Sequence, residues 1–436
     1  MDMKNANIAE LDENTMAEMI LDTIGEDNLF QHPSGTYIFK HHWKPLGKEA
    51  LNNMVRKGIA QLNTLRKEYG HKAEKVTNSR VKGTAELLKM AAFRDDIEFN
   101  SGPRDVVSVA NGDLVLVDGI WSLTEPIREH YRMTRATVTY DPDARAELFP
   151  EFLDSIFEGD LDALEKGNLL LKMMGLALMT DARFERFLFL LGMGANGKSV
   201  FLEVLRHFVG TWNTAAVHPK LFESSFHRQH MDGKLINVVT ESAQGFRLPT
   251  AEVKALVSGE AMTVERKHHD PYVMKPFATF FWATNHLPHP SDYSNAIYRR
   301  TLILNFNQNF EHRADDELAD KLKKELSGIL NMVLPQLAAL LKSGDFDEPV
   351  SSRQARERWR LEGDQSRLWL EQRTERDLVG GIGVKDAFDD YAAWAKENGY
   401  LRTMNQTSFS SRLEAAGWEK VRKAHGMVWR GLRVKK

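Results

Sequence analysis

The sequence predicts an α/β protein with a parallel sheet at its centre, a helical domain before the sheet and a winged-helix domain after it. Residues 186–345 alternate short apolar runs with helical patterns, as a parallel sheet with crossover helices does. Residues 145–180 carry apolar side chains at helical spacing. Residues 365–436 show helix, turn, helix and two strand-like runs around Gly426, which is the order of a winged helix.

These patterns divide the 436 residues into five regions, in keeping with the two to four domains expected at roughly 100 to 200 residues each. The regions are 1–100, of unknown role; 101–185, a hairpin turning at Asn111-Gly112 and a helical domain; 186–345, the sheet domain; 346–364, a linker or helix; and 365–436, the winged-helix domain. Four apolar runs predict the strands of the sheet: 187–191, 235–239, 277–284 and 301–306.

Composition excludes several kinds of chemistry. The chain has no cysteine, which rules out disulfides, thiol nucleophiles, iron–sulfur clusters and cysteine zinc sites. The net charge of −3 says nothing about a polyanionic partner, but two stretches are basic. Residues 402–436 hold nine Lys/Arg against two Asp/Glu, and residues 63–89 hold seven against three. No apolar run reaches the roughly 18 residues of a membrane span, and the acidic N-terminus is no export signal, so we expect a cytoplasmic protein without membrane contact.

The segment FLFLLGMGANGKSVFLEVLRHF contains a P-loop motif between an apolar strand and a helix. Glycines let backbone N–H groups curl around phosphates, and the start of the following helix adds its positive dipole end. Lys198 is then expected to reach the β- and γ-phosphates and Ser199 to bind Mg²⁺. The predicted nucleotide-binding residues are Gly192, Gly194, Ala195, Asn196, Gly197, Lys198, Ser199 and Val200.

Polar residues follow the next two predicted strands. Thr240-Glu241 ends the second run, and a carboxylate there can activate water or hold Mg²⁺. Thr284-Asn285 ends the third run, where an amide can contact the γ-phosphate or merely cap the turn. An exposed glutamate after a buried strand is the alternative explanation of Glu241.

Two cationic features lie between and after these strands. SGEAMTVERKHHDPYVMKPF predicts a hairpin with Arg266, Lys267 and His268 near its tip, suited to a phosphodiester backbone. A zinc site at the two histidines lacks a third ligand at recognisable spacing. Arg299 and Arg300 precede the fourth strand, and a permanently charged guanidinium suits phosphate oxygens. Two exposed surface arginines are the alternative.

The order of these motifs resembles the superfamily 3 helicases, and among them the phage and plasmid primase-helicases related to the poxvirus primase-helicase. The matching stretches are YDPDARAELFPEFLDSIFEGD, LLGMGANGKSVFLEVL, LINVVTES, VKALVSGEAMTVERKHHDPYVMKPFATFFWATNHLP, AIYRRTLILNF and the tail KDAFDDYAAWAKENGYLRTMNQTSFSSRLEAAGW. The likeness covers residues 100–436. It implies an AAA+-like superfamily 3 P-loop ATPase core with a C-terminal winged helix.

Carried onto this chain, the resemblance implies ATP and Mg²⁺ as cofactors, with Lys198 and Ser199 on phosphate and Mg²⁺. It makes Glu241 the activator of water and a Mg²⁺ ligand, and Asn285 the sensor. Arg299, or else Arg300, would be a finger inserted into the neighbouring subunit's site. Arg266, Lys267 and His268 would face the channel of a homo-oligomeric, hexameric ring that moves along single-stranded DNA.

The chain departs from many relatives in two ways. Thr240 stands where many superfamily 3 members carry Asp. Fewer than about 100 residues precede the family match, and the nearest acid pair, Asp160 and Asp162, has a helical context. We therefore expect no primer synthesis and leave open a separate primase partner. Residues 1–100 could recruit that primase or mediate ring assembly.

Three functions remain to be separated. The leading hypothesis is a replicative DNA helicase of a phage or plasmid, in the host cytosol. An origin-binding factor that uses ATP only as an assembly switch would also use a basic winged helix on duplex DNA, with Arg412, Arg422 and Lys423 on phosphates. A small-molecule kinase shares the P-loop but gives no reason for the basic tail.

Overall fold

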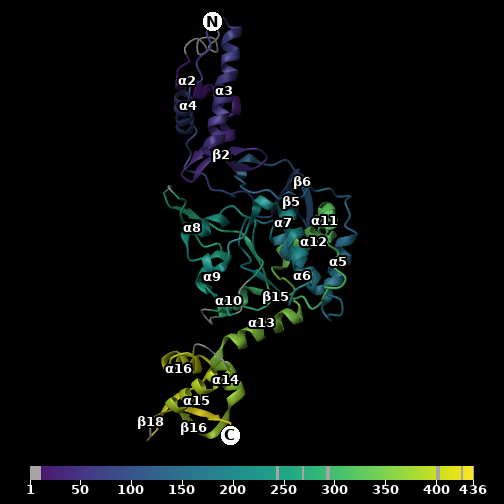
Figure 1. Cartoon of the computed structure of the whole chain (residues 1–436), viewed down its shortest axis with the longest axis vertical. Helices are drawn as coiled ribbons and strands as arrows, with labels where there is room; N and C mark the ends of the chain where they lie inside the picture. The colour runs from purple at the N-terminus through teal and green to yellow at the C-terminus, as the bar shows by residue number, and fades with distance from the viewer. Residues whose placement is uncertain are drawn as a thin grey trace.

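The computed structural model describes residues 11–241, 245–267, 270–290, 295–398, 403–423 and 426–435. The chain forms three bodies along one long axis (Figure 1). An N-terminal domain lies at one end, the domain with the parallel sheet occupies the middle, and a C-terminal domain follows the single helix α13 (Val350–Gly363). The sequence prediction of an α/β protein is therefore confirmed.

The N-terminal domain packs three helices above a small antiparallel sheet. Its elements are α2 (Glu13–Ile24), α3 (Lys48–Glu68), α4 (Asn78–Ala91), β1 (Leu29–His32), β2 (Gly35–Phe39) and β3 (Trp43–Pro45). Asp12 and Thr77 cap α2 and α4 by accepting backbone N–H bonds. Rings from the sheet pack with Phe99 and also with Tyr131, so the packing of this domain crosses the predicted boundary at residue 100.

Residues 101–185 form the predicted hairpin and helices, and they share a core with the central sheet. The elements are β4 (Val106–Val109), β5 (Gly112–Val117), β6 (Ile120–Thr124), α5 (Leu148–Ile156) and α6 (Ala163–Leu176). α11 (Leu318–Leu322) and α12 (Leu326–Ser343) return to pack beside them. By length and composition, Leu318–Ser343 meets the criteria for a membrane span, but the apolar face of α12 is buried against α6.

The central sheet has five parallel strands in the order β15-β7-β13-β9-β8. All four predicted runs are present in it. The strands are β7 (Phe187–Leu191), β8 (Thr214–Ala215), β9 (Ile236–Val239), β13 (Thr279–Thr284) and β15 (Thr301–Asn305). Leu188 and Leu190 face the core with α7 (Lys198–Val209), whereas Phe187 and Phe189 face the core with α9 (Thr250–Val257). Burial on both faces explains why the strands are apolar throughout.

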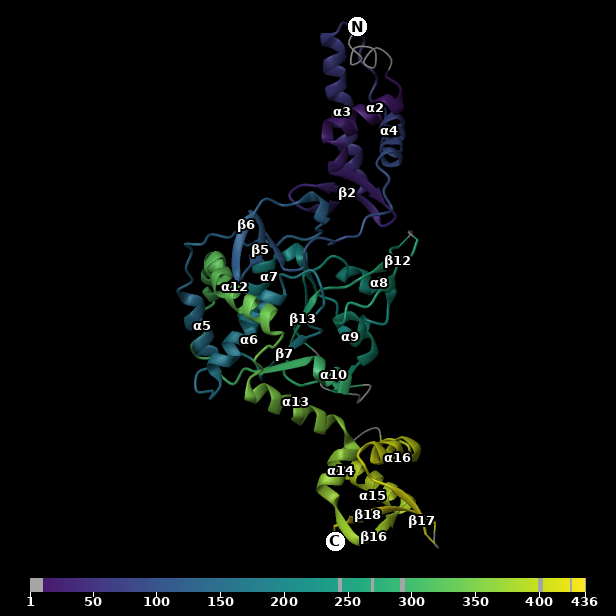
Figure 2. The same ribbon diagram turned by 180° about the vertical axis from the view of Figure 1, so that it is seen from behind.

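Shorter elements complete the central domain. They are α8 (Ser225–Arg228), β10 (Arg247–Leu248), β14 (His289–Pro290), α10 (Asn295–Arg300) and the antiparallel pair β11 (Met262–Val264) and β12 (Tyr272–Met274). The β11–β12 pair is the predicted cationic hairpin, and it extends from the central domain toward the N-terminal domain (Figure 2). His268 and His269, at its tip, lie outside the described residues.

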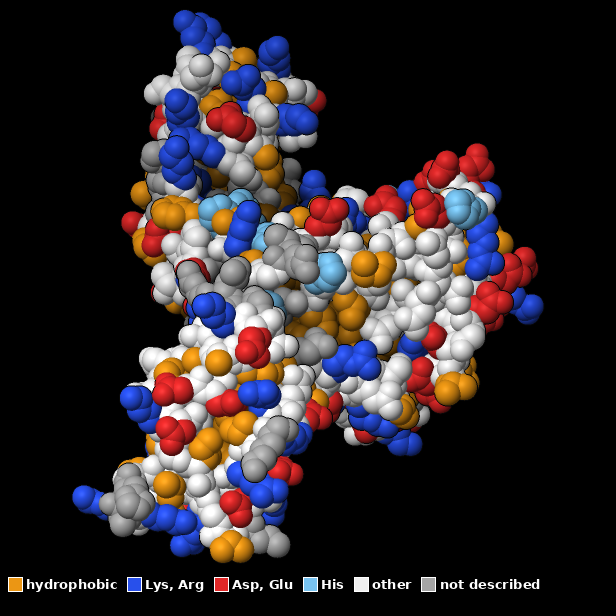
Figure 3. Space-filling model, turned by 60° about the horizontal axis from the view of Figure 1, so that its bottom comes forward, with side chains coloured by type: hydrophobic (Ala, Val, Ile, Leu, Met, Phe, Trp, Pro, Cys, Tyr) orange, Lys and Arg blue, Asp and Glu red, His pale blue; other side chains and the backbone are white. Residues whose placement is uncertain are grey.

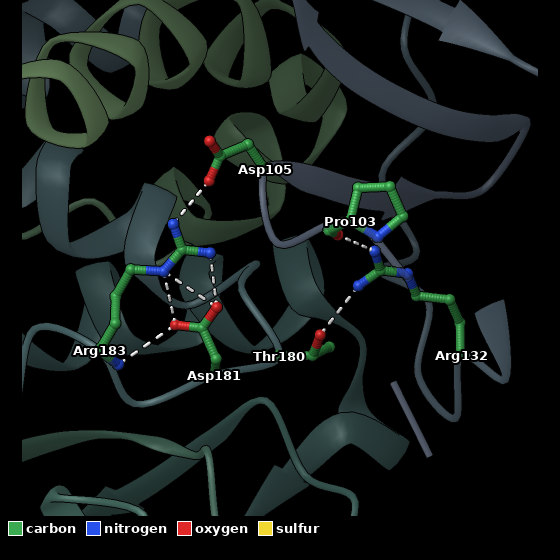
Figure 4. A network of polar contacts seen from close by, with 6 residues as sticks. All are labelled: Pro103, Asp105, Arg132, Thr180, Asp181 and Arg183. Carbon is green, nitrogen blue, oxygen red and sulfur yellow. Dashed lines mark hydrogen bonds and ion pairs between the residues drawn. The ribbon is translucent and has the colours of Figure 1, made fainter. Parts of the chain in front are cut away.

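A polar network fixes the segment that leads into β7 (Figure 4). The Arg183 guanidinium pairs with Asp181 and Asp105, each at 2.6 Å. Arg132, which is buried, donates to the Thr180 hydroxyl at 3.0 Å and to the Pro103 carbonyl. These bonds tie the amino edge of the sheet to the strand β4 region, so this edge has a defined position relative to the helical domain.

The C-terminal domain begins after α13, where the predicted linker is helical. Its elements are α14 (Gln365–Arg373), β16 (Thr374–Gly383), α15 (Val384–Glu397), α16 (Gln406–Ala415), β17 (Lys420–Lys423) and β18 (Gly426–Val434). The two helices and two final strands follow the predicted order, and β16 adds a third strand in the order β16-β18-β17. Trp369, Tyr391, Phe409 and Trp429 fill its core.

Candidate functional site

A cleft of about 730 Å³ opens at the carboxyl edge of the central sheet. We call it the cleft. It is lined by the loop before α7 and by the ends of β9 and β13, together with α5 and the chain that follows β15. Parallel strands place their carboxyl ends at one edge, so residues far apart in sequence meet there. The predicted residues that line it are Gly194, Ala195, Asn196, Gly197, Lys198, Ser199, Val200, Glu241 and Asn285.

The loop from Gly192 to Gly197 is a tight backbone cradle. Gly194, Ala195 and Gly197 have positive φ values of 110°, 45° and 88°. A Cβ on Gly197 would lie 2.6 Å from the Ile156 side chain, and one on Gly192 would lie 2.1 Å from the Asn196 amide. Gly192 does not itself line the cleft, but its carbonyl accepts a bond from Lys198. Packing therefore requires glycine at Gly192 and Gly197, and backbone conformation favours it at Gly194 and Gly197.

Lys198, at the start of α7, is held inside this cradle. Its Nζ donates to the Gly192 carbonyl at 2.7 Å and to Asn196 Oδ1 at 2.8 Å. Burial lowers the pKa of Lys198 to about 8. Asn196 in turn donates to the Phe306 carbonyl, at 3.3 Å, beyond the end of β15. The ammonium group therefore lies ready for an anion at the first turn of α7, where the helix dipole also favours negative charge.

Ser199, Glu241 and Asn285 are exposed at the cleft, each from a different element. Glu241 and Thr240 follow β9, and Asn285 follows β13, which lies between β9 and β7. The Thr284 hydroxyl donates to the His286 carbonyl at 2.7 Å and so shapes the turn that presents Asn285. A hydroxyl and a carboxylate are oxygen ligands of the kind that Mg²⁺ prefers.

The structure adds cleft residues that sequence reasoning missed. Phe310, Arg313 and Asp315 come from the chain after β15, and Phe152 and Ile156 come from α5. The backbone N–H of Phe310 donates to the Ala195 carbonyl at 2.6 Å, and the Arg313 guanidinium lies 4.8 Å from the Phe310 ring centre. Only tertiary packing brings these segments to the loop, and no local pattern in the sequence marks them.

The Arg299–Arg300 pair lies at the opposite edge of the sheet. Both precede β15, whose first residue pairs with Phe187 at the start of β7, whereas the cradle follows the end of β7. The Arg300 guanidinium is buried, bonds to the Ser258 hydroxyl at 2.8 and 3.0 Å and pairs with Glu185 at 2.6 Å. Arg299 is exposed.

The predicted DNA-binding residues of the hairpin differ in their surroundings. Arg266 donates to the Tyr272 hydroxyl at 3.0 Å and to the Ser34 carbonyl of the N-terminal domain at 3.3 Å. It also lies 3.5 Å from the Asp232 carboxylate. Lys267 is exposed. His268 lies outside the described residues, so the structure does not place it.

The C-terminal candidates also differ. Arg412 pairs with Asp364 at 3.3 Å, while Arg422 and Lys423 are exposed on β17. Of the acids considered for primer synthesis, Asp160 pairs with the buried Lys166 at 2.6 Å, and Asp162 lies 3.9 Å from the same Nζ. That acid pair therefore stabilises a buried cation.

Two family descriptions match parts of the chain. Residues 17–158 match "D5 N terminal like", and residues 190–300 match "Family of unknown function (DUF5906)". The first match crosses the predicted boundary at residue 100 and includes β4–β6 and α5. The second begins within β7 and ends with α10, so it covers the cradle, Glu241, the hairpin and Asn285.

Two solved structures are similar to this chain along most of its length. "The A form apo structure of NrS-1 C terminal region-CTR" has a TM-score of 0.50 at 12% identity, and the alignment covers 96% of this chain and 98% of that chain. "The apo structure of NrS-1 C terminal region (305-718)" has a TM-score of 0.49 at 14% identity, covering 98% and 100%. The first shows that the three-domain fold occurs in another protein. The D5-like segment supports a replication-related protein similar to the primase-helicases.

Proposed function

We propose that this chain is an ATP-driven motor that works on single-stranded DNA as a homo-oligomeric ring during phage or plasmid replication. One observation carries the proposal: phosphate-binding and acidic groups meet in the cleft, while the exposed Arg299 lies at the other edge of the same sheet. A single copy cannot bring both to one phosphate. A second copy must supply the arginine, as a ring permits.

The side chains in the cleft suit ATP and Mg²⁺. The cradle N–H groups and the Lys198 ammonium bind the phosphates, and Ser199 and Glu241 provide oxygen ligands for the metal ion. Mg²⁺, when bound, neutralises charge between the β- and γ-phosphates. Glu241 orients and polarises the attacking water, and Asn285 contacts the γ-phosphate. Phe152, Ile156 and Phe310 offer an apolar wall for the base.

Arg299 is the finger in this proposal and Arg300 is not. The two are neighbours on α10, so they point about 100° apart around the helix. The contacts of Arg300 with Ser258 and Glu185 occupy its guanidinium inside the subunit. Arg299 is left at the surface for a partner's cleft, where a guanidinium stabilises charge on the transferring phosphoryl group.

The C-terminal domain is proposed to be a winged helix that binds duplex DNA through phosphate contacts. Its element order and the exposed Arg422 and Lys423 on β17 support this. Each phosphate contact contributes about 0.9 to the slope of log affinity against log salt. Arg422→Ala/Lys423→Ala should therefore reduce that slope by about two. An unchanged slope would remove these residues from the DNA contact.

The test of the function is ATP hydrolysis by the purified chain with and without single-stranded DNA. Lys198→Ala is the inactive reference, and Lys220→Ala is the matched control at an exposed lysine that does not line the cleft. Hydrolysis that DNA stimulates, and that only Lys198→Ala abolishes, supports the motor. Slow turnover that DNA does not change would instead favour an origin-binding factor with ATP as an assembly switch.

A further inference from the structure

A second pocket, of about 890 Å³, lies at the amino edge of the central sheet, opposite the edge that carries the cleft. It is lined by residues that come just before β7, β9 and β13, among them Asp181, Asp232 and Phe277. It is also lined by β12 of the hairpin and by residues 32–34 and 97–100 of the N-terminal region. We call it the amino-edge pocket. Because it is separate from the cleft, a ligand can occupy it while ATP occupies the cleft.

A buried cation in this pocket is held by neutral oxygens instead of a carboxylate. Arg132 lines the pocket and is only 4% exposed. Figure 4 shows its guanidinium bonded to the Thr180 hydroxyl, at 3.0 Å, and to the Pro103 carbonyl, while its Nε has no hydrogen-bond partner among the described residues. Burial lowers the pKa of Arg132, although Asp113 and Asp181 act to raise it, and the group stays charged at neutral pH. A buried charge of this kind favours an anion nearby.

The carboxylates that line the pocket are already engaged by cations. Each of the four has a cationic partner at 2.6 to 3.5 Å, in the pairs Asp181–Arg183, Glu185–Arg300, Asp232–Arg266 and Glu98–Lys275. Arg104 and Arg132 are the lining cations that remain, and no ion pair engages either of them within the described part of the chain. They are neighbours, because Arg132 donates to the carbonyl of Pro103, the residue before Arg104. The charge left in the pocket is therefore positive.

Aromatic rings line the same pocket. The centre of the partly exposed Phe99 ring lies 5.2 Å from that of His32 and 4.9 Å from that of Tyr37. His32 is also partly exposed, and burial lowers the pKa of its imidazole. Tyr272, in β12, adds a ring from the hairpin. Flat rings beside cations suit a nucleotide, whose base stacks on an aromatic ring while its phosphate binds a guanidinium.

A long run of acidic residues lies elsewhere in the molecule. Residues 141–165 contain nine Asp/Glu and one arginine. In the view of Figure 3, acidic side chains gather on the outer edge of the lobe that contains α5 and α11. Figures 1 and 2 place α5 and the hairpin on opposite sides of the central domain. A polyanion is therefore repelled less at the amino-edge pocket than at that lobe.

We propose that the amino-edge pocket binds a nucleotide, with the base against Phe99 and His32 and the phosphate on Arg104 beside Arg132. Its volume is within the range of pockets that hold small molecules. Because β12 of the hairpin lines the pocket, the strand on which the proposed motor moves is one source of this nucleotide. A free nucleotide is the other source. The inference goes beyond the proposed function, since this binding requires no ATP hydrolysis.

Photo-crosslinking of the full chain tests the site. The probes are a short single strand that carries 5-iodouracil, and 5-iodo-dUMP alone, and mass spectrometry identifies the modified peptides. Crosslinks at residues 32–37 or 97–104 are expected. If the strand alone gives them, the strand is the source, and if 5-iodo-dUMP also gives them, a free nucleotide suffices. Absence of crosslinks at these residues with both probes would overturn the proposal. Lys198→Ala should crosslink as the unmodified chain does, so loss of ATP hydrolysis in that variant reports on the cleft alone.

Two variants test the phosphate and base contacts, read from the probe concentration that gives half of the maximal crosslinking. Arg104→Ala should reduce the slope of log affinity against log salt by about 0.7, and Arg104→Lys should keep the slope because the charge remains. Arg353→Ala, at an exposed arginine of α13 that lines neither pocket nor cleft, is the matched control.

Phe99→Leu removes the ring but keeps an apolar side chain in the packing. It should raise the half-maximal concentration, measured at residues 32–37, on the order of tenfold because stacking is lost. Thermal unfolding checks that each variant is folded. An unchanged salt slope in Arg104→Ala, or an unchanged half-maximal concentration in a folded Phe99→Leu chain, would overturn the proposed contacts.

Discussion

The polar side chains at the two edges of the central sheet differ in whether they are exposed or engaged within the subunit. At the carboxyl edge, Ser199, Glu241 and Asn285 are exposed in the cleft. At the amino edge, Arg183 and Arg300 are engaged by carboxylates and hydroxyls of their own subunit. Arg299 is the exception there, since it is exposed. The difference teaches that the carboxyl edge presents polar side chains to the cleft, whereas at the amino edge Arg183 and Arg300 are held by their own subunit and Arg299 is left at the surface.

Arg299→Ala should have the largest effect of these substitutions, on the rate of ATP hydrolysis. ATP should still bind, but kcat should fall on the order of 10³-fold because the charge that stabilises the transition state is lost. Mixing Arg299→Ala with Lys198→Ala chains should recover up to about a quarter of normal hydrolysis, because some interfaces then combine an intact cleft with an intact finger. No recovery in mixed rings, measured by phosphate release after subunit exchange, would place Arg299 outside the neighbour's site.

Arg300→Ala should affect folding instead. It leaves the Ser258 hydroxyl and the Glu185 carboxylate without their guanidinium partner, which should cost about 2 kcal/mol of unfolding free energy. Urea unfolding measures it, and Arg299→Ala should match the unmodified chain in that assay. Equal stability losses in the two variants would contradict the contrast between the arginines.

The pKa of Lys198 predicts a pH dependence at the carboxyl edge. Burial lowers this pKa to about 8, and bound phosphates favour the charged amine, so binding takes up a proton above pH 8. ATP affinity should then fall by up to about tenfold per pH unit above that value. The free energy of unfolding without ATP should change with pH in the opposite direction. Between pH 8 and 10.5 the unfolded chain keeps the Lys198 proton while the folded chain has lost it, so the folded state becomes more stable as the pH rises.

Calorimetric titration with ATP at pH 8.5, in two buffers of different ionisation enthalpy, measures the proton uptake. Lys198→Arg is the control, because a guanidinium stays charged throughout this range. Identical heats in the two buffers for the unmodified chain would contradict the assigned coupling.

Tyr272→Phe should give the smallest effect. It removes the hydroxyl that donates to Asp232 at 2.8 Å and accepts from Arg266, at a cost of about 1 kcal/mol. Hydrogen exchange in β11 and β12 should quicken, while ATP affinity at the distant cleft stays constant. Tyr69→Phe, at an exposed tyrosine of the N-terminal domain, is the control. Unchanged exchange in the hairpin would show that the Arg266 contacts do not stabilise it.

The sequence predicted the sheet well because a strand buried on both faces must be apolar along its whole length. FLFLL corresponds residue for residue to β7. The sheet topology also predicted that Lys198, Glu241 and Asn285 lie close together, because parallel strands end at a common edge. The strand β16 was missed: its TERDLVGGIG sequence carries charges and three glycines, which weaken a strand signal.

Other features could not be predicted from local patterns. Adjacent arginines look alike in a sequence, and only the positions of Ser258 and Glu185 distinguish Arg300 from Arg299. The partner of Arg266 in the hairpin could not be predicted either, because Asp232 lies more than 30 residues earlier in the chain. Phe310 and Arg313 reach the cleft by tertiary packing alone.

The bond from Arg266 to the Ser34 carbonyl has a mechanical consequence. It joins the hairpin, just beyond the end of β11, to the turn between β1 and β2, so in the proposed motor a DNA strand that pulls on the hairpin would also pull on the N-terminal domain. The N-terminal domain would then carry part of the force on the hairpin. In the proposed motor, force on the hairpin would thus reach both the central domain and the N-terminal domain.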